Sequence, residues 1–278
     1  SYAVIIKLII LIAFIGVGIY GLIGNANLEQ LSPANWETPI KLLTGGMVIF
    51  VAYEGFELIA NAAPDMEDPE KNIPRAYYIS IIFVILLYII IAVVTVGSLP
   101  FKEIATAQDY VLAEAAKPML GQVGFTIITI AALISTFSAI NASLYGGSRV
   151  SYEIAEDDEL PNEFTSQLWN QPIGLLITTI LTLTLTNTLE LESISTAGSV
   201  GFLLIFAIVN LVGFKLSKET KSNRTIALAG FILCSIAMLA LLQQQFGSNI
   251  MGVIVAVSLI GFCFAVEAIY KWMERRKK

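Results

Sequence analysis

Two carboxylates lie near the middle of a strongly apolar stretch. Glu54 and Glu57 fall within residues 42–63, a run of about twenty residues, which is long enough to cross a bilayer as a helix. A charged side chain at mid-membrane costs about 2.5–3.5 kcal/mol on insertion scales, so it usually faces a cavity or a partner. Gly55 between the two glutamates is a position where such a helix opens easily, and irregular backbone is tolerated in a membrane only where protein encloses it. The stretch therefore predicts a binding site of the kind that membrane carriers build from interrupted helices.

The two glutamates each admit two interpretations. Glu57 is either a gating or proton-sensing carboxylate just beyond the opened segment, or a buried side chain that caps exposed amides. We favour the first, because burying a carboxylate without a task is costly. Glu54 would share a face with Glu57 in an intact helix. In an opened helix it takes part in binding, or it points into a water-filled vestibule and only solvates it.

Lys7 and a group of hydroxyl residues are further candidates. Lys7 lies in the first apolar run, where it either extends to the lipid headgroups or occupies a cation site as a buried amine that exchanges protons. Position alone favours the first of these. Small polar residues between 135 and 143 either let helices pack closely or ligate a cation or amine. They include Ser135, Thr136, Ser138, Asn141 and Ser143.

Composition sets the class of protein. Of the 278 residues, 56% are hydrophobic and 14% are charged, against about 25% charged residues in a typical soluble domain. The sequence therefore predicts an all-α polytopic membrane protein. There is no histidine, so proton coupling would have to use carboxylates or a lysine. Cys234 and Cys263 lack metal-site spacing, and no hydrolase or nucleotide-binding motif is present. We expect no enzyme activity, cofactor, metal site or nucleic-acid partner.

Eight apolar runs predict transmembrane helices in a single membrane domain. Their bounds are about 2–24, 42–63 (a broken helix), 76–98, 121–152, 172–188, 194–216, 224–246 and 249–272. Residues 101–118 form helix-compatible sequence with an amphipathic pattern, which we expect to lie on the outer membrane surface.

Loop charges predict the orientation. With both termini in the cytoplasm, and Lys7 set aside, twelve basic residues fall at inner ends and three at outer ends, as the positive-inside rule requires. The inner ones are Lys71, Arg75, Arg149, Lys215, Lys218, Lys221, Arg224, Lys271, Arg275, Arg276, Lys277 and Lys278, and the outer ones are Lys41, Lys102 and Lys117. We expect a multi-pass protein of the cell membrane.

Three motifs resemble the amino acid–polyamine–organocation superfamily of transporters. The segment AYEGFELIANAAPDMEDPEKNIPRA (52–76) is similar to the family's sixth helix and the loop after it. Residues 141–161 resemble the cytoplasmic end of the eighth helix, and 199–216 resemble the tenth. The family has twelve helices, ten of which form two inverted five-helix repeats around a midplane site. By this resemblance the eight spans are helices five to twelve, so helices one to four would be absent.

The resemblance assigns roles residue by residue. Substrate contacts of the sixth helix fall on Phe50, Val51, Ala52, Tyr53, Glu54 and Gly55. Glu57 matches a gating glutamate, and Lys7 matches a lysine that replaces sodium in sodium-independent members, which now favours a functional role. Ser135 and Ser138 would be its neighbours at that cation site.

The sequence departs from the family at two positions. Related permeases usually have an apolar residue where Glu54 stands, so a cationic substrate becomes possible, and Asp68 stands where asparagine is more common. The resemblance implies a secondary carrier of amino acids or related amines, proton-coupled or sodium-independent, that works by alternating access. A non-transporting amino acid sensor or partner subunit on the same scaffold is the alternative.

Overall fold

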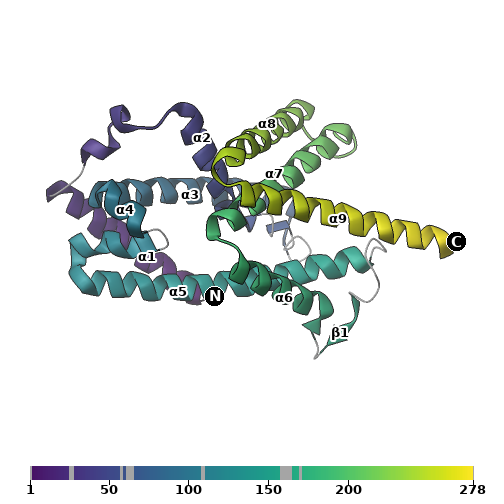
Figure 1. Ribbon diagram of the computed structural model, residues 1–278, viewed down its shortest axis with the longest axis horizontal. Helices are drawn as coiled ribbons and strands as arrows, with labels where there is room; N and C mark the ends of the chain where they lie inside the picture. The colour runs from purple at the N-terminus through teal and green to yellow at the C-terminus, as the bar shows by residue number, and fades with distance from the viewer. Residues whose placement is uncertain are drawn as a thin grey trace. The chain divides into compact units, whose positions relative to one another are not determined.

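The chain is built almost entirely of helices (Figure 1). The computed structural model describes residues 2–24, 28–56, 59–60, 66–107, 110–156, 165–168 and 171–277. Six of the described helices are long and apolar enough to cross a membrane. The all-α polytopic membrane architecture predicted from composition is therefore confirmed.

The elements follow one another in a simple order. Their bounds are α1 (Tyr2–Gly24), η1 (Leu28–Leu31), η2 (Pro33–Asn35), α2 (Pro39–Val48), η3 (Ile49–Tyr53), α3 (Pro69–Ser98), α4 (Phe101–Ala107), α5 (Val111–Glu156), β1 (Gln167–Leu168), β2 (Gln171–Pro172), α6 (Ile173–Thr188), α7 (Leu191–Lys215), α8 (Arg224–Ser248) and α9 (Ile250–Lys277). The strands β1 and β2 form a two-residue antiparallel pair.

Two of the predicted spans correspond to helices shorter than a full crossing. Over the span 42–63, which we predict to be broken, the described chain has the ten-residue α2 followed by the 3₁₀ helix η3. The run 172–188 corresponds to α6, with 16 residues. By contrast, α3 begins at Pro69, ahead of the predicted residue 76. Its first residue follows Asp68, which has a left-handed backbone (φ 46°) of the kind that asparagine and aspartate adopt most readily.

The chain divides into two compact units. One comprises Ser1–Glu37 and Gly55–Ser143, and the other comprises Thr38–Glu54 and Leu144–Lys278. The chain passes from one unit to the other between Glu54 and Gly55, inside the stretch that carries the candidate site.

In the first unit, α1 packs along α3 through glycines. A Cβ at Gly97 of α3 would lie 2.6 Å from Leu22 Cδ2, and one at Gly18 of α1 would overlap Val94. Small residues permit this close approach between membrane helices. Both contacts lie toward the carboxyl ends of the two helices, so the helices run parallel.

Gln30, in the 3₁₀ helix η1, connects this segment to the end of α3. Its side-chain amide donates to Val96 O and Leu99 O, both at 2.8 Å, and its Oε1 accepts from Phe101 N at 2.8 Å. A single side chain thus satisfies backbone groups where α3 stops and α4 starts, which helix termini otherwise leave unpaired.

The helix α5 contains a bend at Gly121. Its backbone there is left-handed (φ 63°), which glycine adopts without steric cost. The bend separates residues 111–120 from the long apolar segment that follows. The sequence predicts a boundary at the same place, between a surface helix ending at 118 and a span starting at 121.

In the second unit, α7 lies at the centre and contacts α2, η3, α6, α8 and α9. Its buried face is rich in small residues, which allow several neighbours to approach. The buried residues of α7 are Ser193, Thr196, Ala197, Ser199, Val200, Leu203 and Ala207. Leu241 of α8 and Ala256 of α9 complete this core.

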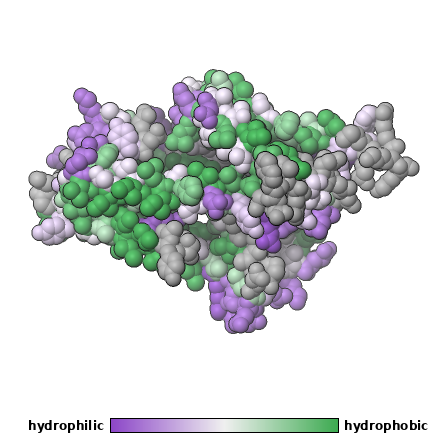
Figure 2. Space-filling view, turned by 90° about the horizontal axis from the view of Figure 1, so that it is seen from below, coloured by the Kyte–Doolittle hydropathy of each residue, from purple (hydrophilic) through white to green (hydrophobic). Residues whose placement is uncertain are grey.

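Large apolar side chains cover much of the protein surface. Figure 2 shows broad hydrophobic areas on the face it presents, and Ile23, Ile79 and Leu233 are 82%, 69% and 66% exposed. Exposed apolar patches of this extent mark contact with lipid or protein rather than with water.

The α7–α8 contact yields a stability prediction. A Cβ at Gly230 of α8 would overlap the Asn210 side chain, whereas one at Gly213 of α7 would meet Ala227 Cβ at 3.8 Å, an ordinary contact. We expect Gly230→Ala to lower the free energy of unfolding by about 1–3 kcal/mol, the usual cost of overpacking. Gly213→Ala is the matched control and should be neutral or slightly stabilising, because alanine favours the helix. Unfolding in detergent checks both, and equal effects of the two substitutions would contradict the packing described.

Candidate functional site

The predicted binding stretch changes its helix type and then stops being helical. The α-helix α2 ends at Val48, the 3₁₀ helix η3 runs to Tyr53, and Glu54 is extended (φ −54°, ψ 144°). Gly55 has φ +105°, a conformation that is strained for any residue with a Cβ. The backbone therefore departs from the α-helix between the residues that the family resemblance assigns to substrate.

A buried hydroxyl of α7 holds the start of this departure. Ser199 Oγ accepts a hydrogen bond from Val51 N at 3.0 Å and donates one to Val48 O at 3.0 Å. Ser199 is completely buried (0% exposed). Ser199, which follows Val51 by 148 residues and Val48 by 151, thus contacts both ends of the first 3₁₀ turn of η3.

Close packing supports these hydrogen bonds. A Cβ at Gly198 would lie 3.0 Å from Val51 Cγ2, so a glycine beside Ser199 lets α7 approach η3. The ring of Phe50 meets Phe206 of α7 edge-on, with centroids 6.1 Å apart, and Phe206 stacks on Phe202 at 6.0 Å. Aromatic pairs of this geometry stabilise a contact beyond the area they bury.

After the interruption, the chain is anchored within the first unit. Phe56 contacts Tyr77 of α3 edge-on, with ring centroids 5.8 Å apart. Residues up to Glu54 thus contact α7 within the second unit, and Phe56 contacts α3 within the first.

The predicted substrate residues differ in exposure. Phe50, Val51, Tyr53 and Gly55 are half-buried, whereas Ala52 and Glu54 are exposed. Five of the six, Phe50 to Glu54, lie in the second unit and Gly55 begins a segment of the first. Glu57 lies outside the described residues, so its gating role stays a prediction.

The predicted cation site lies in the first unit. Lys7 of α1 and both serines of α5, Ser135 and Ser138, are half-buried. The two helices share one apolar cluster, to which α1 contributes Phe14 and α5 contributes Ile128. Within the described part of the chain no hydrogen bond joins Lys7 to either serine, so the grouping stays a prediction.

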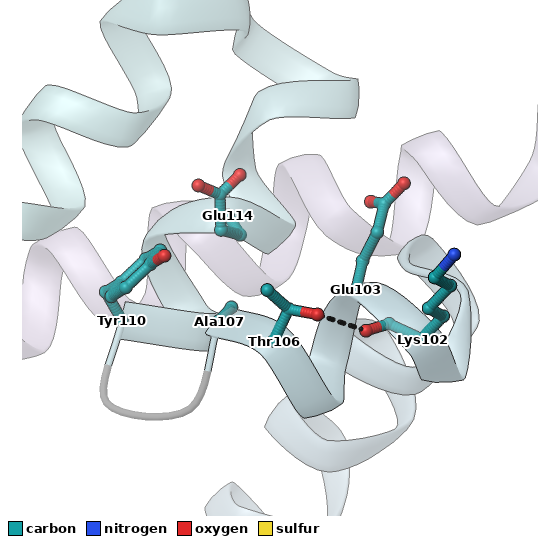
Figure 3. A pocket seen from close by; sticks show the side chains of 6 residues that line it. All are labelled: Lys102, Glu103, Thr106, Ala107, Tyr110 and Glu114. Atoms are coloured by element: carbon teal, nitrogen blue, oxygen red, sulfur yellow. Dashed lines mark hydrogen bonds between the residues drawn. The ribbon is translucent and has the colours of Figure 1, made fainter.

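The described surface also has a hollow away from these residues. It measures about 360 Å³ and lies between α4 and the start of α5 (Figure 3). The residues that line it are Lys102, Glu103, Thr106, Ala107, Tyr110 and Glu114. None of them belongs to the predicted substrate or cation site.

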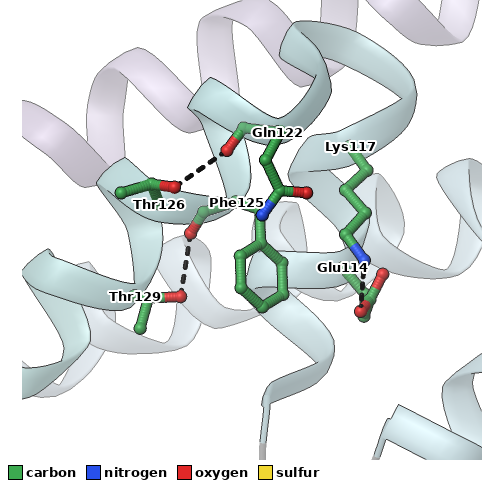
Figure 4. Close-up of polar contacts among 6 residues, drawn as sticks. All are labelled: Glu114, Lys117, Gln122, Phe125, Thr126 and Thr129. Atoms are coloured by element: carbon green, nitrogen blue, oxygen red, sulfur yellow. Dashed lines mark hydrogen bonds and ion pairs between the residues drawn. The ribbon is translucent and has the colours of Figure 1, made fainter.

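Glu114, which lines this hollow, is paired locally. Lys117 Nζ lies 2.7 Å from Glu114 Oε1 and 4.6 Å from the centroid of the Phe125 ring, and Thr129 Oγ1 donates to Phe125 O (Figure 4). Of these contacts, the one between Lys117 and Phe125 joins the two sides of the bend at Gly121. An ion pair and a cation–π contact of this kind serve structure, so we do not assign substrate binding here.

Ser199 is the residue that sequence reasoning missed. It begins the segment that resembles the family's tenth helix, but serine is common at helix interfaces in membranes. No local pattern shows that its hydroxyl contacts η3. Only the tertiary contact identifies it.

Comparison with known proteins extends these observations. The sequence profile of a family described as "Amino acid permease" matches residues 1–270. An uncharacterized protein of Methanocaldococcus jannaschii is 35% identical over 249 residues, which make up 89% of this chain and 57% of that protein. The inner membrane transport protein YbaT of Escherichia coli is 31% identical over 234 residues, or 82% of this chain and 52% of that protein.

A third relative has a substrate class in its name. The mitochondrial cationic amino acid transporter 3 of Arabidopsis thaliana is 29% identical over 171 residues, which make up 60% of this chain and 28% of that protein. The chain spans little more than half the length of the first two relatives, at 57% and 52%, and less of the third.

Proposed function

This chain belongs to the amino acid permease family, and from that premise we propose that the complete protein is a secondary carrier of amino acids that works by alternating access. Family membership places the chain among transporters rather than enzymes, and its apolar helices place it among multi-pass membrane proteins. We propose further that transport is proton-coupled or independent of sodium.

The observation that carries the proposal is the interrupted helix from Val48 to Gly55. Carriers bind substrates near the bilayer midplane, where discontinuous helices turn backbone groups and helix ends toward the charged ends of the ligand. We propose that the backbone from Ala52 to Gly55 contacts the amino and carboxyl groups of the substrate. Phe50 and Tyr53 would shape the pocket and close it.

Lys7 and Glu57 are the proposed coupling groups. A lysine amine in place of a sodium ion would make the cation site independent of sodium, and a carboxylate beside the binding segment would link its protonation to gating. The chain contains no histidine, so residues of these types are the ones available for such a role.

The proposed orientation has both termini in the cytoplasm and the protein in the cell membrane. Support comes from the excess of basic residues at the inner ends of the predicted spans, such as Lys215 at the end of α7 and Lys218 and Lys221 between α7 and α8. Translocation leaves lysine- and arginine-rich loops on the cytoplasmic side.

Uptake of radiolabelled amino acids into proteoliposomes that contain the complete protein tests the function. We expect a pH gradient alone to drive uptake, and Glu57→Gln to abolish its dependence on pH, because the amide cannot take up a proton. Glu67→Gln is the matched control, since Glu67 is an exposed loop residue ten positions further on. An unchanged pH profile in Glu57→Gln would contradict the proton role.

Other outcomes of the same assay have definite meanings. Uptake that needs a sodium gradient would contradict the role of Lys7. Amino acid binding without flux under any gradient would contradict the carrier and favour the sensor.

Glu54 yields a prediction about substrate charge. It is exposed at the end of η3, and a carboxylate there would favour basic substrates, in keeping with the name of the Arabidopsis relative. We expect Glu54→Leu to lower uptake of lysine and arginine by about tenfold, the scale of one hydrogen bond to a charged group. Leucine uptake in the same vesicles is the internal control. A parallel fall for basic and neutral substrates would rule out selection by charge at this position.

A further inference from the structure

Ser199 forms a hydrogen-bond pattern that fits the 3₁₀ form of η3. In a 3₁₀ turn, the backbone carbonyl of one residue faces the amide of the third residue after it. Ser199 Oγ lies between such a pair, because it accepts from Val51 N and donates to Val48 O, each at 3.0 Å. A hydroxyl supplies one donor and two acceptor positions, so it can serve both groups at once.

The alternative backbone conformation would use these groups differently. If α2 continued as an α-helix, the amide of Val51 would bond to the carbonyl of Met47, and the carbonyl of Val48 would bond to the amide of Ala52. Both groups would then have partners within the helix. In the 3₁₀ turn Val51 N faces Val48 O and also donates to Ser199 Oγ, whereas in the α-helix it would be directed to Met47 O instead. The hydrogen bond from Val51 N to Ser199 therefore favours the 3₁₀ conformation over the α-helical one, in the turn that follows the end of α2.

The position of Ser199 makes this contact rigid. Ser199 is completely buried on α7, which contacts α2, η3, α8 and α9. Gly198 brings the backbone of α7 so close that a Cβ there would lie 3.0 Å from Val51 Cγ2. A donor and acceptor held on a packed helix imposes its geometry on the segment it contacts, as supporting residues do around binding sites.

We propose that Ser199 is a positioning residue for the substrate-binding segment. Its hydroxyl fixes the residue at which the α-helix ends and η3 begins. It thereby sets the orientation of the backbone groups from Ala52 to Gly55 toward the substrate. This role rests on the proposed function, since it acts on the segment that we assign to substrate. It operates through the backbone of Val48 and Val51 rather than through contact with the amino acid.

Three variants of the complete protein separate this role from general stability. Ser199→Ala removes the hydroxyl, and Ser199→Thr keeps it. The matched control is Ser193→Ala, because Ser193 is also buried on α7 (3% exposed) and donates a hydrogen bond to Asn249 Oδ1 at 3.1 Å, away from η3.

The first readout is amide hydrogen exchange in detergent without substrate, in the peptide that covers Val51. We expect exchange about tenfold faster in Ser199→Ala, the scale of losing one hydrogen bond, and parental exchange in Ser199→Thr and Ser193→Ala. Exchange in Ser199→Ala that equals the parent's or is slower would overturn the proposal, and so would equal acceleration in Ser193→Ala.

The second readout is the KM and the maximal rate of uptake. We expect Ser199→Ala to raise KM several-fold with a smaller change in the maximal rate, and Ser199→Thr to restore the parental KM. An unchanged KM in Ser199→Ala would overturn the proposal. If the parental protein transports no amino acid, the proposed function fails, whereas the exchange experiment still decides the role of Ser199.

A fourth variant covers the case in which Ser199→Ala does not fold. Ser199→Cys keeps nearly the same volume and a weak donor and acceptor, and we expect it to fold with exchange at Val51 faster than in the parent. Parental exchange in this variant would overturn the proposal.

Discussion

A backbone that leaves the α-helix inside an apolar environment must find partners for its amides and carbonyls within the protein. The rest of the structure depends on how this requirement is met between Val48 and Gly55. On one side, the Ser199 hydroxyl contacts Val48 O and Val51 N. On the other, Gly55 adopts a positive φ of 105° that few other residues tolerate. These two features make an interrupted helix possible where the family resemblance places the substrate.

The helix α7 meets this requirement because the residues on its packed face are small and buried. Its row of serine, threonine, alanine and glycine residues lets η3, α8 and α9 approach closely, and such residues are common where membrane helices pack. The same row carries the hydroxyl that contacts η3. Close packing and the hydrogen bonds to η3 are therefore two consequences of one stretch of sequence, since Gly198 brings the backbones together and Ser199 forms the hydrogen bonds.

The structural features that could be predicted from the sequence are those that depend on neighbouring residues in the chain. Hydropathy predicted the long helices, and the glycine between two glutamates marked the stretch in which the backbone departs from the α-helix. Sequence reasoning did not predict that α2 ends at Val48, where the carbonyl accepts a hydrogen bond from Ser199, 151 positions further along the chain. Nor did it identify Gln30, whose three hydrogen bonds join α3 to α4, because one glutamine in a polar loop has no distinguishing pattern. Tertiary contacts, which no local pattern in the sequence shows, distinguish these residues.

We propose above all that the segment from Ala52 to Gly55 contacts the transported amino acid. Thiol labelling tests it most directly, in the complete protein with its native cysteines replaced and a single cysteine introduced by Ala52→Cys, at an exposed position of η3. A saturating transported amino acid should slow labelling at this position several-fold. It should leave labelling of the control Ser222→Cys, in the exposed loop between α7 and α8, unchanged. Equal labelling rates at position 52 with and without the amino acid would contradict the account.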